Sequence, residues 1–170
     1  MGAITLNLLL ISGGKHPYGE TTPVLAGFLK EAGHKVDISE SALELAVSSL
    51  DGYDAVVLNT LRTDEFGNNL KEGQRENLRK WVEDGGGLVS IHISPASCPD
   101  WPEMKKLTGG GWVFGQSHHP PFGRFTMEIT DSSHPCATGL SDFRIDDEAY
   151  CDLDIQPGIE VFMSTVVEGK

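Results

Sequence analysis

The sequence has few cysteines, and they are not paired by spacing. Cys98, Cys136 and Cys151 are odd in number, and no Cys-x-x-Cys motif occurs. A small secreted scaffold would carry an even, closely spaced set, and a thiolate zinc site would need paired cysteines. The pattern therefore argues against a disulfide framework and against zinc bound by sulfur, and it favours reduced thiols in a cytoplasmic protein.

Positive charge is also scarce. Lys and Arg total 13 against 25 Asp and Glu, which gives a formal net charge of −12 in 170 residues. Because binding to nucleic acid or to an anionic membrane needs clustered basic side chains, neither is an expected partner. No apolar run is long enough to cross a bilayer, and no basic segment precedes the first one. We expect a cytoplasmic protein with a small-molecule ligand.

The first half of the chain alternates strand-like and helix-like segments. Short apolar runs predict strands at residues 3–12, 35–39, 55–58 and 88–91, and helical spacing predicts helices at 23–32, 41–50 and 70–82. Thr21 or Thr22 is the expected cap of the first helix, with Pro23 at its first position. This rhythm predicts the α/β class: a flavodoxin-like three-layer sandwich with a mainly parallel sheet.

The second half is richer in proline and glycine, so shorter elements are expected. The pattern predicts a helix at 103–107, a half-buried strand at 125–129, further strands at 143–145 and 160–166, and a turn at His134-Pro135. The chain stops after a strand-like run, where a doubly wound domain normally adds a helix. We therefore expect one domain over residues 1–170 that lacks its C-terminal end.

His92 holds the position where such folds often place a nucleophile. It follows the glycines and apolar residues of the fourth predicted strand, and ligands bind at the carboxyl ends of strands in open α/β sheets. Related hydrolases carry Ser or Cys in this turn. Cys98 comes too late in the chain, so glutaminase chemistry is not expected. Ser90 is expected to face the sheet packing and Ser94 lacks the glycines of a serine elbow, so a serine hydrolase is not expected either.

Imidazole and carboxylate groups follow several of the predicted strands. His16 follows the first, Asn59 the third and His92 the fourth, while Glu148 ends an Asp-Asp-Glu run. Such groups suit proton transfer, and they also suit Zn²⁺, Mn²⁺ or Fe²⁺. The alternative to a functional role is that each histidine is simply a turn residue, as we expect for His34. His118 and His119 are adjacent, so in an extended segment they point opposite ways and one of them serves a site.

Six short motifs in order resemble the trehalose-utilisation (ThuA-like) family. They are Ser12-Gly13-Gly14-x-His16, the run from Gly86 to His92, Trp101…Leu107-x-Gly109-Gly110, His119-Pro120, Asp131-x-x-His134-Pro135…Gly139-Leu140, and Asp147-Glu148-x-Tyr150. The resemblance implies the class I glutamine amidotransferase-like fold and a role in carbohydrate metabolism, often with disaccharides. It favours five site positions: His16, His92, His119, His134 and Glu148.

The sequence departs from the family pattern at two places. Pro95, Ala96 and Ser97 stand where the family commonly has an Asp after the elbow histidine, and the chain ends before a glycine-rich strand and a further histidine. If that missing segment helps to build the family's site, part of the site is absent here.

Together these observations favour a protein that acts on trehalose, a related disaccharide or a keto-sugar by acid–base or metal-assisted chemistry. The alternatives left open are a non-catalytic sugar-binding or regulatory module and an assembly role; homo-oligomerisation is also open. Carboxylates accept hydrogen bonds from sugar hydroxyls, and Trp101, Trp112 or Tyr150 would stack on a pyranose face. We expect one pocket with catalytic His92 and Glu148, substrate-binding His16, His119, Asn59 and Tyr150, and any divalent metal such as zinc on His16, His92, His119 and Glu148.

Overall fold

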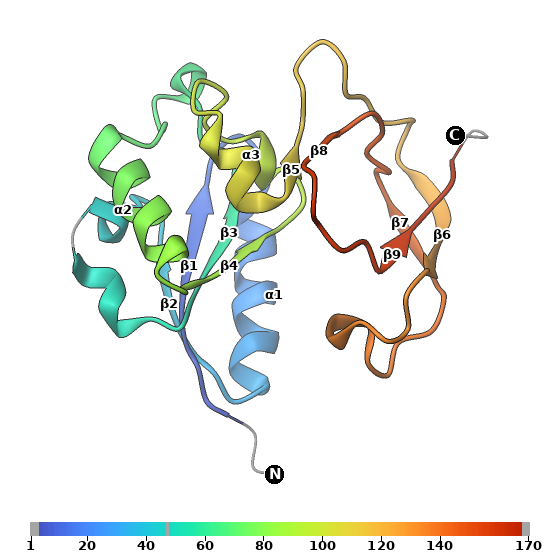
Figure 1. The fold of residues 1–170 in the computed structure, drawn as a ribbon, viewed down its shortest axis with the longest axis horizontal. Helices are drawn as coiled ribbons and strands as arrows, with labels where there is room; N and C mark the ends of the chain where they lie inside the picture. The colour runs from blue at the N-terminus through green and yellow to red at the C-terminus, as the bar shows by residue number, and fades with distance from the viewer. Residues whose placement is uncertain (1–3, 47, 168–170) are drawn as a thin grey trace. The chain divides into compact units, whose positions relative to one another are not determined.

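The computed structural model describes residues 4–46 and 48–167, with the side chains of 48 and 49 left out. The chain divides into two compact units, Met1–Gly111 and Trp112–Lys170, and each is described by itself. Figure 1 traces both units from the blue N-terminal strand to the red C-terminal segment. That residues 1–170 form one domain stays a prediction.

The first unit is built on a parallel sheet of four strands in the order β2-β1-β3-β4. The strands are β1 (Asn7–Gly13), β2 (Lys35–Ser39), β3 (Ala55–Thr60) and β4 (Gly87–Ser90). Leu9 pairs with Asp37 on one side and with Val56 on the other, which fixes the register of the central strand. The predicted α/β class with a flavodoxin-like parallel sheet is confirmed.

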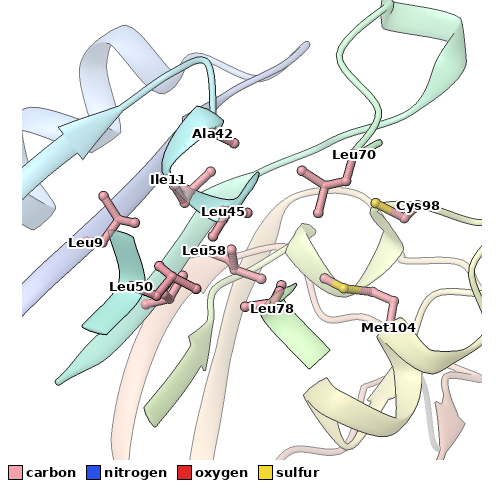
Figure 2. Packing of buried hydrophobic residues seen from close by; sticks show 11 residues of the cluster. Leu9, Ile11, Ala42, Leu45, Leu50, Leu58, Leu70, Leu78, Cys98 and Met104 are labelled. Carbon is pink, nitrogen blue, oxygen red and sulfur yellow. The ribbon is translucent and has the colours of Figure 1, made fainter. Parts of the chain in front are cut away.

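Helices cover both faces of this sheet (Figure 1). Helix α1 (Tyr18–Glu31) lies on one face, and α2 (Glu72–Glu83) and α3 (Glu103–Thr108) lie on the other. Leu8 and Leu10 of β1 pack with Leu25 of α1, while Leu9 and Ile11 pack into the opposite core. That opposite core, shown in Figure 2, also contains Leu78 and Met104. Because β1 is buried on both sides, its apolar run is continuous rather than alternating.

Two local predictions in the first unit are wrong. Helix α1 begins at Tyr18, before the expected caps, and Pro23 lies inside it. Thr22 turns inward and its hydroxyl lies 2.6 Å from that of Ser12, so it fills a buried position instead of capping the helix. The segment predicted as a helix at 41–50 forms two short 3-10 helices, Leu43–Ala46 and Ser48–Gly52. Ala42, just before the first of them, has a left-handed backbone (φ 55°), which an α-helix starting at residue 41 could not contain.

The predicted strand at residues 55–58 continues to Thr60, and the predicted helix at 103–107 is present as α3. Two further 3-10 helices, Asp64–Phe66 and Ser94–Ala96, follow β3 and β4, and the short strand β5 (Gly110–Gly111) ends the unit. Residue 3, at the start of the first predicted strand, lies outside the described residues.

The second unit contains an antiparallel sheet in the order β7-β6-β9. Strand β6 (Gly123–Ile129) pairs with β7 (Phe143–Asp147) and with β9 (Met163–Ser164). Phe125 and Met127 of β6 are half-buried while Thr126 is exposed, which confirms the predicted half-buried strand. The last strand is shorter than the predicted span of 160–166. A 3-10 helix, Pro135–Ala137, and the short strand β8 (Asp154–Ile155) complete the unit.

Candidate functional site

In the first unit, two histidines meet beyond the carboxyl ends of the strands. The ring centroids of His16, after β1, and His92, after β4, are 5.6 Å apart in an edge-to-face arrangement. The ring of Tyr18 lies 5.8 Å from that of His16. Because the strand order changes direction between β1 and β3, this edge is where open α/β sheets bind ligands. The structure therefore brings together two of the expected site residues.

His92 is exposed and its backbone is left-handed, with φ at 54°. A non-glycine residue in this region costs about 1 kcal/mol or more, and such strain clusters at functional sites. The turn is anchored by Ser94, whose buried hydroxyl donates to Leu58 O at 2.8 Å and accepts from Thr60 N at 3.1 Å. Through these two bonds Ser94 ties the turn to the end of β3.

Arg62, which follows β3, ties the end of β1 to the loop after β2. Its side chain is only 3% exposed, and its guanidinium donates to Ser12 O at 2.9 Å and to Glu40 O at 2.7 Å. Burial lowers the pKa of this guanidinium from its usual value. The same region buries the phenol of Tyr18, and that burial raises the Tyr18 pKa to about 12. Both side chains hold the frame around His16, and nothing in the local sequence pattern identified Tyr18.

Asn59 lies at the end of β3 and faces α1. Its side chain is 6% exposed, and its amide nitrogen donates to the hydroxyls of Thr21 at 3.3 Å and Thr22 at 3.1 Å. These contacts join the strand to the helix, so the amide nitrogen is already engaged. A substrate-binding role for Asn59 stays a prediction.

In the second unit, an isolated antiparallel bridge sets the geometry of the expected site. His118 and Cys151 exchange backbone hydrogen bonds of 3.2 and 2.8 Å. In such a pairing the next residue on one strand opposes the previous residue on the other, so His119 and Tyr150 face each other. Ser117 anchors the loop by accepting from Val113 N at 2.8 Å and donating to Asp152 O at 2.8 Å.

The side chains on the His119 face form a ring cluster. Trp112 and Tyr150 meet edge to face with centroids 5.1 Å apart, and His119 lies 5.9 Å from Tyr150 and 6.3 Å from Trp112. Glu148 follows β7, and its Oε1 lies 3.8 Å from His119 Nε2. We call Trp112, His119, Glu148 and Tyr150 the aromatic–carboxylate cluster. Its side chains are partly exposed, so a ligand can reach them.

The hydrogen bonds of His119 determine which ring nitrogen carries the proton. Nδ1 lies 2.8 Å from Pro120 O, and a carbonyl oxygen only accepts, so Nδ1 is the donor. In the neutral ring, Nε2 then holds the basic lone pair and faces Glu148. The arrangement offers an imidazole nitrogen beside a carboxylate.

The adjacent His118 points to the other face, where its Nδ1 lies 3.4 Å from Asp152 Oδ2. His134 stacks on Phe162 with centroids 4.5 Å apart, and its Nδ1 accepts from Cys136 N at 3.1 Å. That bond caps the short helix at Pro135–Ala137, as the turn predicted at His134-Pro135 requires. His34 Nδ1 accepts from Leu6 N at 3.3 Å, which agrees with its expected structural role.

The four expected metal ligands divide between the units, with His16 and His92 in the first and His119 and Glu148 in the second. Across residues 4–46 and 48–167, no group of three or more His, Cys, Asp or Glu side chains gathers as a metal site would need. The metal site and the convergence of His92 with Glu148 in one pocket both stay predictions.

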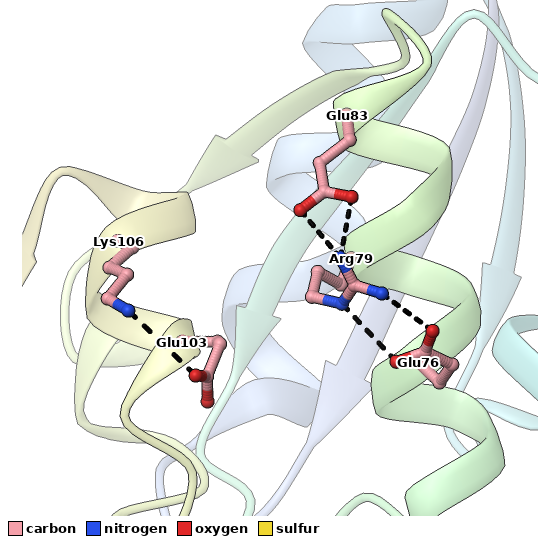
Figure 3. A network of polar contacts seen from close by, with 5 residues as sticks. All are labelled: Glu76, Arg79, Glu83, Glu103 and Lys106. Atoms are coloured by element: carbon pink, nitrogen blue, oxygen red, sulfur yellow. Dashed lines mark hydrogen bonds and ion pairs between the residues drawn. The ribbon is translucent and has the colours of Figure 1, made fainter.

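A cleft of about 1190 Å³ lies elsewhere in the first unit, along α2 and α3. Figure 3 shows its polar side chains: Arg79 bonds to both Glu76 and Glu83, and Lys106 lies 3.9 Å from Glu103. These charges satisfy one another within their own helices. Of the residues singled out in the sequence, Trp101 lines this cleft, but no expected catalytic, substrate-binding or metal-binding residue does, so we do not take it as the candidate site.

The model of the ThuA family, described as trehalose utilisation, matches residues 7–169. The chain belongs to the ThuA family. No curated protein matches it. Among the described residues of this ThuA protein, none forms a helix long and apolar enough to cross a membrane.

Solved structures support the fold. A ThuA-like protein from Parabacteroides merdae has a TM-score of 0.79 at 21% identity, over 95% of this chain and 68% of that one. A ThuA-like protein from Bacteroides uniformis has a TM-score of 0.76 at 17% identity, over 98% and 70%. A GMP synthase protein from Thermoplasma acidophilum has a TM-score of 0.61 at 18% identity, over 95% and 74%. The last fits the predicted glutamine amidotransferase-like fold.

Proposed function

We propose that this ThuA protein acts on a sugar, and that the aromatic–carboxylate cluster binds it. The observation that carries the proposal is the combination of two aromatic rings with an imidazole and a carboxylate on one partly exposed face. Aromatic rings pack on the apolar faces of pyranoses, and carboxylates accept hydrogen bonds from their hydroxyls. The family's description as trehalose utilisation makes a trehalose-like disaccharide the first candidate.

The chemistry we propose for the cluster is general base catalysis. With Nδ1 donating to Pro120 O, His119 Nε2 takes the proton from a sugar hydroxyl, and Glu148 stabilises the imidazolium that forms. A positioned base of this kind contributes a factor of about 10²–10⁴ to a rate. This proposal adds His119 to the catalytic groups, where the sequence had favoured Glu148 with His92.

For the first unit, we propose that His92 serves as a second acid–base group. Its exposure and its left-handed backbone support this role, since such strain persists where function requires it. His16 lies against its ring and supplies a polar neighbour for a sugar hydroxyl. Glutaminase activity is not part of the proposal, because the elbow holds a histidine and the thiol of Cys98 is buried.

Turnover of trehalose, followed by the ¹H NMR signals of its anomeric protons, tests the proposal. We expect wild type to convert the sugar, and Glu148→Gln to reduce the rate by about tenfold or more. Glu128→Gln removes an exposed carboxylate on β6 and serves as the matched control. Binding without turnover would instead support the non-catalytic sugar-binding module, and no binding of trehalose would contradict the proposed ligand.

A further inference from the structure

Helices cover the two faces of the parallel sheet unequally. Helices α2 and α3 lie on one face, whereas within the described part of the first unit α1 is the only helix on the other. Helix α1 packs on β1, β2 and β3. Neighbouring strands are roughly 4.8 Å apart and packed helices roughly 8–10 Å, so a helix beside α1 would lie over β4, two strands from β1. The face of β4 on this side is therefore where a second helix would fit.

The floor of this position is formed by β3 and β4. Val57 of β3 and Val89 of β4 are directly paired, so their side chains leave the sheet on the same face. Val57 belongs to the same core cluster as Leu25 of α1 and is 4% exposed, whereas Val89 is 49% exposed. Gly87, two residues before Val89, lies on the same face and adds no side chain. The apolar surface of the sheet thus extends beyond the area that α1 covers.

One flank of α1 forms the wall beside this floor. Thr21, Val24 and Phe28 are spaced at i, i+3 and i+7, so they lie on the same flank of the helix. The hydroxyl of Thr21 accepts from Asn59 Nδ2 at 3.3 Å, and Asn59 belongs to β3, so this flank faces β3 and β4 rather than β2. Val24 is 70% exposed and Phe28 is 55% exposed. We call the space bordered by Val24, Phe28, Gly87 and Val89 the α1–β4 groove.

Exposed carboxylates border the α1–β4 groove at both ends. Glu20 lies four residues before Val24 and Glu31 seven residues after it, so both are on the Val24 side of the helix. Because α1 joins two parallel strands, it runs back along them, and Glu31 lies at the end of the sheet where Asp54 precedes β3 and Asp84 precedes β4. An apolar groove with negative charge at its ends is complementary to an amphipathic helix that carries basic residues beside its apolar face.

A second copy of the chain fits this groove poorly. If two α1 helices packed through this flank in antiparallel directions, Glu20 of each copy would lie near Glu31 of the other. In parallel directions, each glutamate would meet its own equivalent. Like charges at such positions are destabilising, and the net charge of −12 adds to the repulsion between copies.

We propose that the α1–β4 groove docks an amphipathic helix of a partner protein, and that Lys or Arg side chains of that helix pair with the carboxylates at the ends of the groove. The apolar side chains of the partner helix, spaced at i, i+3 or i+4 and i+7, pack between Phe28 and Val89. Burial of these apolar groups supplies affinity, and the charges select the partner. This docking surface is separate from the proposed sugar chemistry and does not depend on it.

Two synthetic peptides that differ only in charge test the proposal with the full chain. Each is a helical peptide of about 18 residues with Leu along one face, bordered by Lys in one peptide and by Glu in the other. Fluorescence anisotropy of the labelled peptides measures their binding. We expect the Lys peptide to bind wild type about tenfold more tightly than the Glu peptide, because the ends of the groove carry carboxylates.

Substitutions locate the binding surface. Phe28→Ala should weaken binding of the Lys peptide about tenfold, whereas Leu43→Ala, which removes a similarly exposed apolar side chain from a 3-10 helix outside the groove, should leave it unchanged. The double variant Glu31→Lys, Asp84→Lys should shift the preference toward the Glu peptide. Glu72→Lys, on α2 across the sheet, is the matched charge control and should not shift it. Circular dichroism checks the fold of each variant.

Sedimentation equilibrium tests the other occupant, a second copy of the chain. We expect Phe28→Ala to leave the association state of the protein unchanged. A wild-type dimer that Phe28→Ala dissociates would assign the groove to a second copy and overturn the proposal. Equal losses of peptide binding in Phe28→Ala and Leu43→Ala, or an unchanged peptide preference in the charge-reversed double variant, would also overturn it, as would failure of the Lys peptide to bind.

Discussion

The ring of His92 meets the ring of His16 edge to face, although the strands that carry them are not neighbours. Strand β3 lies between β1 and β4, so the two loops reach over its carboxyl end to meet. The turn at His92 holds a left-handed backbone, and its hydrogen bonds run to residues at the end of β3. The contact between the two rings therefore depends on the backbone conformation of the turn as well as on the side chains.

Replacement of His92 measures the strain in that turn. We expect His92→Gly to be more stable than His92→Ala by about 1 kcal/mol, because glycine adopts a positive φ without the steric cost that a Cβ brings. Urea unfolding of the two variants checks this difference. Equal free energies of unfolding would show that the turn relaxes and that the strain is absent.

The glycine loop after β1 is closely packed against the end of β3. A Cβ at Gly14 would lie 2.4 Å from Leu61 O, and φ there is 126°. We expect Gly14→Ala to destabilise the protein by about 2 kcal/mol or more, because both the backbone and the contact resist it. Gly27, inside α1 with open space around it, is the control: Gly27→Ala should stabilise by about 0.5–1 kcal/mol. Similar effects of the two changes would contradict the packing described.

The ion pair between Arg75 and Asp100 predicts a pH-dependent contribution to stability. Two hydrogen bonds of 2.8 and 2.9 Å from Arg75 lower the pKa of Asp100 from 3.8 to about 2. Since the folded state holds the carboxylate ionised, its stabilisation is present above pH 4 and is lost as the pH falls toward 2.

Asp100 is half exposed, so screening limits the effect, and Asp100→Asn should cost about 0.5–1 kcal/mol at pH 7. Denaturant unfolding at pH 7 and at pH 2 measures this cost. If Asp100→Asn lowers the free energy of unfolding equally at pH 7 and at pH 2, the loss does not come from the charge of Asp100.

Elemental analysis tests the metal prediction. Protein purified without chelator and without nickel affinity should lose any stoichiometric divalent metal in the His92→Ala, His119→Ala double variant and keep it in Cys136→Ser. Imidazole and carboxylate are sufficient ligands for a catalytic zinc, which needs three protein ligands and an open position. Metal that survives the double variant would place the site elsewhere.

The sequence predicted the parallel sheet because β1 and β3 are buried on both faces and their apolar runs are unbroken. It did not predict the start of α1, because a threonine before a proline resembles a cap whether or not its hydroxyl faces the core. In the second unit, the alternation of apolar and polar residues identified β6. The length of the last strand was overestimated: only Met163–Ser164 forms a strand, and the apolar residues Val161 and Val166 on either side are exposed.

The candidate site was only partly predictable, because its side-chain contacts depend on how distant segments pair. The sequence indicates that the adjacent side chains of His118 and His119 point in opposite directions in an extended segment. It does not indicate that His118 pairs with Cys151, because that pairing joins segments distant in the chain. Tyr150 was expected in the site, whereas its edge-to-face contact with Trp112 and the tautomer fixed by Pro120 O come from loop geometry alone. The position of Tyr18 beside His16 depends on burial, for which the sequence carries no periodic pattern.

Calorimetric titration of trehalose into wild type and Trp112→Ala tests the central proposal most directly. Phe114→Ala is the control, because Phe114 is an aromatic residue with 62% exposure that makes no part of the aromatic–carboxylate cluster. Loss of one stacking ring should weaken binding by about tenfold, since aromatic contacts contribute about 0.5–1.5 kcal/mol beyond their buried area. We predict binding by wild type and Phe114→Ala and a tenfold loss in Trp112→Ala; equal affinities for all three would contradict the account.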